Sequence, residues 1–469
     1  MAAVETTETT EHTETTEHTE HTDYSETVVI GAGQQGCAVA ASLQELGREA
    51  LVVERGEIGQ SWAHERWDSL LVGSGNRSVR FPGWEYDGDD PDGHMPGREL
   101  AGHLRQYVHE RKLRVLRHTP VREVECLPDA SERDDVRFRT RLSGGGTIES
   151  RNLVAALGGY AAPRVPGLAA DVDPSVTQLH THDYRNPESL PPGAVLVVGA
   201  GISGQQIADE LLHAGRRVFL SVGRHLAWPY HYRGRSLHEW MFVFALHEDF
   251  NTAITFDYAG AGADAGADAG AGTGEGIAVL PGLPVGAVQD GRGELNLGTL
   301  AARGVVLVGS VRAADGRMLK LEDNVVAVAE ASARSYRQVI DTIDSGIRQR
   351  GFPVPEQRPV PGVDMTCIAP FAEALDLGRH GITTIVWCTG FGPDYRILPA
   401  RLLDGNGAPL QHKGVLGALP GLYYAGLPDG NSLSPVAISA CVTNGRFIAR
   451  QIHVDHVLRS GSQASIIAS

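Results

Sequence analysis

Two glycine-rich turns of identical spacing constrain the fold of this chain more than any other feature. The turns read Gly31-Ala-Gly33-Gln-Gln-Gly36 and Gly199-Ala-Gly201-Ile-Ser-Gly204. Each follows a short apolar strand and begins a helical stretch, which is the order of a βαβ unit. In such a unit the first glycine permits the tight turn, the second admits a pyrophosphate, and the third lets the helix pack closely on the strand. The pair of turns therefore predicts two dinucleotide sites.

The residue that follows the second strand of each unit predicts a difference between the two sites. Glu54 ends that strand in the first unit, where an acidic side chain accepts hydrogen bonds from a ribose diol. The second unit repeats the first at an offset of 168 residues, so Val222 corresponds to Glu54. Ser221 and Arg224 flank Val222, and a hydroxyl with a guanidinium suits a 2′-phosphate. We expect a nucleotide without that phosphate in the first site and one with it in the second.

Composition limits the function classes that remain. The chain has 469 residues, 42% of them apolar, which fits two or three domains. It shows neither a long apolar run nor a secretory signal pattern, so we expect a cytoplasmic protein. Its five cysteines form no C-x-x-C pair, and we expect no disulfide framework and no metal site. The net charge is −16, but eight acidic residues lie within the first 26 positions, so the rest of the chain is only mildly acidic. A net-negative body argues against nucleic acid and anionic membranes as partners.

Local patterns divide the chain into segments. Residues 1–26 repeat Glu, Thr and His with little apolar content and predict a disordered tail. Residues 259–276 are nearly all Gly, Ala and Asp and predict a flexible surface loop. Alternating or apolar runs predict strands at 121–124, 136–140, 152–157, 382–388 and 421–426, and helical spacing predicts a helix around 336–347. The glycine-containing strand ends near 157 and 389 are typical of chain crossings between domains.

Further short motifs follow one another between about residues 27 and 455. They are Gly59-Gln-Ser-Trp62, Arg66-Trp-Asp-Ser-Leu70, Tyr86-Asp-Gly-Asp-Asp-Pro-Asp-Gly-His-Met95, Trp387-Cys-Thr-Gly-Phe391 and Gly421-Leu-Tyr-Tyr-Ala-Gly-Leu427. Together with the two glycine turns, this set resembles the flavin-containing monooxygenases. The similarity is to the bacterial single-component enzymes near the plant indole-pyruvate monooxygenases.

The resemblance implies a fold, a reaction and two cofactors. It implies an α/β fold with two Rossmann-like domains, FAD in the first site and NADPH in the second. One oxygen atom of O₂ would pass to a small organic substrate through a peroxyflavin, by N- or S-oxygenation or by oxidative decarboxylation. We expect a discontinuous FAD domain at 27–185 and 386–469, with the NADPH domain at 186–385 inserted in it. A homodimer is compatible with this interpretation.

The resemblance and the glycine turns together identify the residues expected at the cofactors. The expected FAD contacts are Gly31, Gly33, Gln35, Gly36, Glu54, Arg55, Gln60, Ser61, Trp62, Met95 and Val121. The expected NADPH contacts are Gly199, Gly201, Ser203, Gly204, Ser221 and Arg224. Thr389 and Gly390, at the second crossing, complete the set of expected cofactor contacts.

Two residues are candidates for a catalytic role. Asn76 is a candidate amide near the flavin, although a turn-forming asparagine explains it equally well. His180 falls in the signature that the family carries between its two glycine turns, where Pro174 and Val176 here replace a phenylalanine and a glycine. A proton-transfer role and a hinge role are both open for His180, and the hinge is favoured.

Other function classes share the two glycine turns. A disulfide reductase would need a reactive cysteine pair, and the sequence shows none. A flavoprotein that acts as a redox sensor, or an NADPH oxidase that makes only peroxide, remains an alternative to a monooxygenase.

Overall fold

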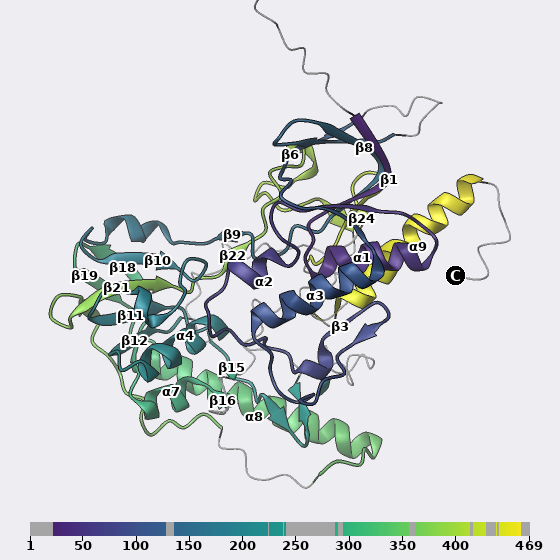
Figure 1. The fold of residues 1–469 in the computed structure, drawn as a ribbon. Helices are drawn as coiled ribbons and strands as arrows, with labels where there is room; N and C mark the ends of the chain where they lie inside the picture. The colour runs from purple at the N-terminus through teal and green to yellow at the C-terminus, as the bar shows by residue number, and fades with distance from the viewer. Residues whose placement is uncertain are drawn as a thin grey trace, which may run out of the picture.

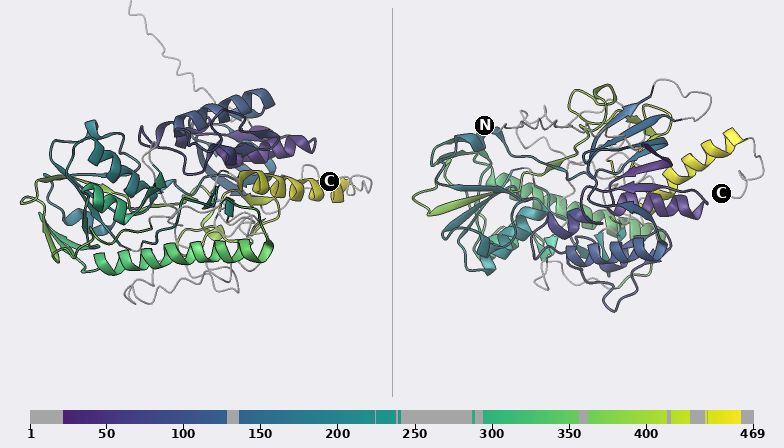
Figure 2. Two further views of the ribbon diagram at one scale, coloured as in Figure 1. Left: turned by 90° about the horizontal axis from the view of Figure 1, so that it is seen from below. Right: turned by 45° about the horizontal axis from the view of Figure 1, so that its top comes forward.

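The computed structural model describes most of the chain. The described residues are 22–127, 136–223, 225–237, 239–240, 287–288, 294–355, 362–412, 416–427, 438 and 440–460. The predicted loop at 259–276, residues 1–21 of the predicted tail, and Arg224 lie outside these ranges. Two sheets lie side by side, and a long helix, α8, runs below both of them (Figures 1 and 2).

The first sheet has a parallel centre in the order β25-β8-β1-β2-β5. These strands are β1 (Thr22–Ile30), β2 (Leu51–Val53), β5 (Arg114–Leu116), β8 (Thr147–Ala155) and β25 (Leu422–Tyr424). Antiparallel strands extend it, namely β6 (Val121–Cys126), β7 (Phe138–Leu142), β23 (Gln411–His412) and β24 (Leu416–Gly417). The helices α1 (Gln34–Glu45), α3 (Gly97–Arg111) and α9 (Ala440–Ser460) accompany it. The C-terminal segment therefore returns to complete the sheet that the N-terminal segment begins.

Strand β1 starts earlier than the composition of the chain predicted. Residues 22–26, assigned to the disordered tail, are part of β1, and Thr22 to Ser25 pair with residues 147–150 of β8. Ser25 is buried in this position. The tail boundary was wrong there because main-chain hydrogen bonds to a neighbouring strand need no apolar side chains.

The second sheet is parallel throughout, in the order β10-β21-β11-β12-β17. Its strands are β10 (Thr177–His180), β11 (Ala194–Val198), β12 (Val218–Ser221), β17 (Val306–Val308) and β21 (Ile382–Trp387). The helices of this part are α4 (Ile202–His213), α7 (Leu297–Arg303) and α8 (Val325–Arg350), and a meander of β18 (Val311–Asp315), β19 (Met318–Leu321) and β20 (Ala374–Asp376) follows β17. Because β10 pairs with β21, residues 177–180 lie in this sheet and not in the FAD segment at 27–185 to which they were assigned. A short alternating run does not reveal which sheet it will join.

Two connections between the sheets run next to each other. The strand β9 (Ala162–Pro163) pairs antiparallel with β22 (Phe391–Gly392). They follow the strand ends near residues 157 and 389, where the sequence predicted crossings. The remaining elements are α2 (Gln60–His64), β3 (Arg80–Phe81), β4 (Trp84–Glu85), β13 (His231–Tyr232), β14 (Arg235–Ser236), β15 (Ala287–Val288), β16 (Glu294–Leu295) and the 3₁₀ turns η1 (Asn76–Ser78), η2 (Gly167–Asp171), η3 (Pro187–Ser189) and η4 (Ala400–Leu402).

The long helix α8 contacts two hydrophobic clusters. Val325 and Val328 at its start pack in the core beside the second sheet. Val339 and Ile343 in its later turns pack against Trp240 and its aromatic neighbours. Within the described ranges, no helix combines the length and the apolar character needed to cross a membrane.

The packing of α9 on α1 gives a first prediction. Gly445 in α9 faces α1 so closely that an added Cβ would lie 2.8 Å from the carbonyl oxygen of Ala38. We expect Gly445→Ala to lower the free energy of unfolding by about 1–3 kcal/mol, measured by urea denaturation. Gly102 in α3 is the matched control, because its added Cβ would meet only the end of Arg105 at 3.9 Å. Gly102→Ala should raise stability by about 0.5–1 kcal/mol, and equal effects of the two substitutions would contradict the prediction.

Candidate functional site

The two glycine turns repeat each other in their main-chain hydrogen bonds. The N–H of Gly31 donates to the carbonyl of Val53 at 2.8 Å, and the N–H of Gly199 donates to that of Ser221 at 3.0 Å. In each unit the third strand then docks beside the first. Ala156 donates to Ile30 at 2.9 Å, and its counterpart Cys388 donates to Val198 at 2.8 Å. The offset of 168 residues therefore holds in three dimensions for the first two strands and the turn.

The first and third glycines of each turn are required by the fold itself. A Cβ on Gly31 would lie 2.4 Å from the carbonyl oxygen of Ala156, and one on Gly36 would lie 2.0 Å from that of Gly31. In the second turn the equivalent distances are 2.4 Å for Gly199 and 1.8 Å for Gly204. Gly31 and Gly199 also have positive φ values of 109° and 107°, which favour glycine.

The middle glycine of each turn faces open space. A Cβ on Gly33 or on Gly201 would meet no heavy atom within 4 Å among the described residues beyond its chain neighbours. Their φ values of −80° and −69° suit any residue, so the backbone does not require glycine at either position. Each is the N-cap of a twelve-residue helix, and neither caps its helix with a side-chain hydrogen bond. The first N–H groups of a helix have no partner within that helix, and an open surface in front of them is the arrangement that binds a phosphate, so both turns fit a dinucleotide.

Glu54 is held in place next to the first turn. Its side chain is buried, and its two carboxylate oxygens accept hydrogen bonds from the N–H of Ala32 at 2.7 Å and of Gly56 at 2.9 Å. An ionised carboxylate has about four acceptor positions, so capacity for a ribose diol remains. The equivalent Val222 in the second unit is fully buried and apolar. Of these two equivalent positions, the first carries an acid and the second does not.

Ser221 does not face outward as the sequence led us to expect. Its hydroxyl is buried and donates to the carbonyl oxygen of Gly309 at 2.9 Å, which ties β12 to the loop after β17. That donor is therefore already used inside the sheet. Ser203, in the first turn of α4, is half-buried and lies two residues beyond Gly201.

The segment from Arg55 to Trp62 forms a compact loop beside the first turn. Trp62 in α2 donates its indole N–H to the side-chain oxygen of Gln34, at the start of α1, at 2.6 Å. The side chain of Gln60 accepts from the N–H of Glu57 at 3.1 Å, and Arg55 forms an ion pair with Glu65. These contacts position the loop, and Ser61 lies half-buried within α2.

The other expected FAD contacts lie in two environments. Gln35 is buried at the start of α1, where its side-chain oxygen accepts from Asn444 of α9 at 3.3 Å. Met95 is buried in the core around α1 and α3. Val121 packs at the edge of the core on the other face of the sheet, among residues such as Phe138. The sheet therefore lies between Val121 and the cluster that holds Met95.

Asn76 uses both polar atoms of its side chain to brace a loop. Its amide oxygen accepts from the N–H of Met95 at 2.7 Å, and its amide nitrogen donates to the carbonyl of Asp90 at 2.8 Å. The residue is 4% exposed. This geometry supports the turn-forming interpretation of Asn76 over direct contact with a reacting group.

His180 joins the second sheet to the crossing strand. It donates from Nε2 to the carbonyl of Gly390 at 2.9 Å, while Nδ1 accepts from the N–H of His182 at 3.1 Å. Burial lowers the pKa of His180, which favours the neutral ring that this pair of contacts requires. Thr389 donates its hydroxyl to the carbonyl of Arg164 on the neighbouring crossing. Both contacts support a hinge role for this group of residues.

A partly buried carboxylate that the sequence did not single out connects the two units. Glu210 of α4 accepts from the hydroxyl of Ser69 at 2.8 Å and from the hydroxyl of Tyr184 at 2.8 Å. Burial raises the pKa of Glu210. Ser69 belongs to the motif that begins at Arg66, so this contact fixes the motif against the second unit. A single glutamate in a helical segment is normally exposed to solvent, so the sequence did not indicate this contact.

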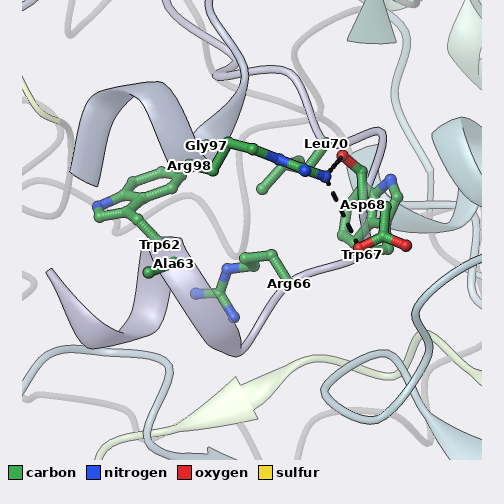
Figure 3. Close-up of a pocket in the computed structure, with 8 residues that line it drawn as sticks. All are labelled: Trp62, Ala63, Arg66, Trp67, Asp68, Leu70, Gly97 and Arg98. Atoms are coloured by element: carbon green, nitrogen blue, oxygen red, sulfur yellow. Dashed lines mark hydrogen bonds and ion pairs between the residues drawn. The ribbon is translucent and has the colours of Figure 1, made fainter. Parts of the chain in front are cut away.

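A cavity of about 150 Å³ lies beside the same motif (Figure 3). Its lining residues are Trp62, Ala63, Arg66, Trp67, Asp68, Leu70, Gly97 and Arg98. Trp62 and Gly97 come from α2 and α3 of the first unit, whereas Trp67 and Leu70 pack into the hydrophobic core beside the second sheet. The sequence identified this motif only as a piece of a family pattern and gave Arg66 no role.

Comparison with known proteins places this architecture among flavoprotein oxidoreductases. The family model for pyridine nucleotide-disulphide oxidoreductases matches residues 28–232. The uncharacterized oxidoreductase CzcO of Bacillus velezensis is 24% identical over 431 residues, which cover 91% of this chain and 99% of that protein. A solved mutant of the flavin monooxygenase from Stenotrophomonas maltophilia is similar in fold, with a TM-score of 0.61 and 19% identity over 92% of this chain and 99% of that one.

A plant monooxygenase is also similar to this chain in sequence. Indole-3-pyruvate monooxygenase YUCCA1 of Oryza sativa subsp. japonica is 29% identical over 197 residues, which cover 42% of this chain and 47% of the plant protein. The chain thus spans about half the length of the plant monooxygenase that it matches. These similarities agree with the motifs and with the two glycine turns. The chain is therefore similar to the flavin-containing monooxygenases, and these similarities support a flavin-dependent enzyme that works with FAD and NADPH.

Proposed function

We propose that this enzyme binds FAD at the Gly33 turn and NADPH at the Gly201 turn and inserts one oxygen atom of O₂ into a small organic substrate. The observation that carries the proposal is the pair of turns whose middle glycine stands at the start of a helix and faces open space among the described residues. The two sheets would form the two nucleotide domains, with the first sheet built from both ends of the chain. The predicted cytoplasmic location and homodimer stay predictions.

The assignment of the two cofactors depends on the residues at their adenosine ends. Glu54 beside the first turn would accept the ribose hydroxyls of FAD. A carboxylate would repel the 2′-phosphate of NADPH, and the second unit has the apolar Val222 in its place. Arg224, which lies outside the described residues, would pair with that phosphate.

The described side chains act by placement and by exclusion of water. FAD supplies the oxygen chemistry when bound, and NADPH supplies its electrons. Asn76 would hold the loop around Met95, and His180 would hold the crossing at Gly390. Glu210 would keep the Arg66 motif against the second unit, so that the two nucleotides meet in a fixed geometry. Amines, thioethers and 2-oxo acids are the substrate classes we propose.

The cysteines favour an oxygenase over a disulfide reductase. Burial raises the pKa of the Cys37 thiol, and it raises the pKa of Cys388 and of Cys441 to about 12. These three thiols therefore stay protonated at neutral pH and are poor nucleophiles. No two cysteines of the chain are spaced as a C-x-x-C pair. A reductase would need at least one reactive thiolate beside the flavin.

The proposed reaction predicts a defined fate for oxygen. The purified enzyme should carry about one FAD per chain and oxidise NADPH faster when a substrate from a panel of small amines, thioethers and 2-oxo acids is present. Under ¹⁸O₂, mass spectrometry should find one labelled atom in the product for each coupled NADPH. If hydrogen peroxide accounts for all NADPH with every panel member, the chain is an NADPH oxidase and the proposal is wrong.

The glycine geometry predicts a separation between folding and cofactor binding. Gly33→Ala should leave the stability of the apoprotein within about 0.5 kcal/mol, because the added methyl meets open space. It should weaken FAD binding at least tenfold, because the methyl occupies the proposed pyrophosphate position. The matched Gly36→Ala should lower apoprotein stability by about 1–3 kcal/mol. Flavin fluorescence titration and urea denaturation measure both effects, and wild-type FAD affinity in Gly33→Ala would contradict the proposal.

The predicted phosphate contact of Arg224 can be tested through nucleotide preference. Arg224→Ala should raise the KM for NADPH by about tenfold or more and leave the KM for NADH nearly unchanged, because only NADPH carries the 2′-phosphate. Steady-state flavin reduction with both nucleotides measures the ratio. Arg312→Ala is a control, because Arg312 pairs with Glu322 at the surface of the same unit. Equal changes in the two KM values would refute the contact.

A further inference from the structure

Arg66 lies in a cage of aromatic rings. Its guanidinium carbon is 5.5 Å from the ring centroids of Tyr160 and Phe391 and 6.0 Å from that of Trp62. The three rings come from the turn after β8, from β22 and from α2, so the cage joins both crossings to the first unit. Aromatic faces stabilise a cation, yet they accept few of its five N–H donors.

The Arg66 guanidinium has no carboxylate partner within the described part of the chain. Its hydrogen bond there goes to the carbonyl oxygen of Glu65 at 3.0 Å, and the carboxylate of Glu65 is paired with Arg55. Burial lowers the pKa of Arg66, which reflects the cost of its charge at this place. Arg66 is partly buried, and a cation that is partly removed from water in a protein is normally paired with an anion. Arg66 therefore has the character of a ligand-binding group.

The cavity next to Arg66 has a net positive lining. Figure 3 shows Arg66 between Trp62 on one side and Asp68 on the other, with Arg98 across from it. The negative charge of Asp68 is compensated by Arg98, which lies 3.7 Å from the Asp68 carboxylate. Arg98 also donates to the main-chain carbonyl of Asp68 at 2.9 Å. Asp68 also accepts from Asn186 at 2.7 Å. One positive charge, that of Arg66, is left over for one negative charge of a ligand.

A further donor belongs to the same lining. The indole N–H of Trp67 is buried and has no acceptor among the described residues. Trp67 packs in the core beside the second sheet, whereas Trp62 belongs to the first unit. At about 150 Å³ the cavity is smaller than the roughly 300–1,000 Å³ of typical ligand pockets, so it suits a small anionic end group.

We propose that Arg66 binds a single anionic oxygen group, a carboxylate or a phosphate, of a molecule held between the two nucleotide turns. The substrate is the favoured source, because the pyrophosphates of both cofactors are already assigned to the Gly33 and Gly201 turns. The substrate is then a small carboxylic acid, such as a thioether acid or a 2-oxo acid. This inference rests on the proposed function, because the proposed FAD and NADPH sites leave the cavity beside Arg66 for the substrate.

The test is equilibrium binding to the oxidised, FAD-containing enzyme without NADPH, so that no turnover occurs. The probes are (methylthio)acetate and its uncharged methyl ester, titrated by calorimetry, with NADP⁺ titrated in parallel. The variants are Arg66→Gln, which removes the charge, and Arg66→Lys, which keeps it. Arg114→Gln is the matched control, because Arg114 is exposed and pairs with Glu49. FAD content and thermal unfolding are recorded for every variant.

We expect the wild-type enzyme to bind the acid about tenfold or more tightly than the ester. Arg66→Gln should abolish that difference, Arg66→Lys should keep part of it, and Arg114→Gln should keep all of it. If Arg66→Gln instead weakens the binding of NADP⁺ by a similar factor, Arg66 still binds an anion, and that anion is a phosphate of the nucleotide. If neither variant changes the affinity for the acid or for NADP⁺, the inference is overturned. It is also overturned if both variants lose FAD. A yellow enzyme that NADPH reduces but that fails this test leaves the proposed function intact, whereas a colourless protein that refuses FAD refutes the proposed function itself.

Discussion

The close contact between a strand-end carbonyl and the first glycine of each turn is the constraint on which the rest of the structure depends. The carbonyls of Ala156 and Cys388 lie where a side chain on Gly31 or Gly199 would have to be. This contact lets the third strand dock beside the first and brings the N-terminus of the following helix to the edge of the sheet. The two turns thus become equivalent surfaces, and within the described part of the chain the middle glycine of each turn faces open space.

The two units are joined by a few polar and aromatic contacts. His180 reaches the crossing at Gly390, Glu210 reaches Ser69, and Phe391 contacts the guanidinium of Arg66. Two of these contacts hold the motif that begins at Arg66, and Arg66 lines the cavity. The placement of a substrate between two nucleotides would depend on them, because the flavin chemistry itself needs few protein side chains.

The sequence predicted the repeated units well but misjudged individual polar side chains. The offset of 168 residues and the crossings near 157 and 389 follow from local spacing, and they are present in the structure. Ser221 was expected to face a phosphate, yet its hydroxyl donates to Gly309, a partner 88 positions away. Which neighbour a hydroxyl or an amide finds depends on distant segments, and no local pattern contains that information.

The sequence by itself determined the class of fold and the two nucleotide turns, because a glycine turn between a strand and a helix is a local feature set by backbone geometry. It also indicated which of the two units carries an acid, because Glu54 stands at the end of the second strand of the first unit. Only the tertiary structure decided that residues 177–180 join the second sheet and that residues 22–26 extend the first. It alone revealed the aromatic cage of Arg66, because three rings that are far apart in the chain become neighbours only when the two units pack.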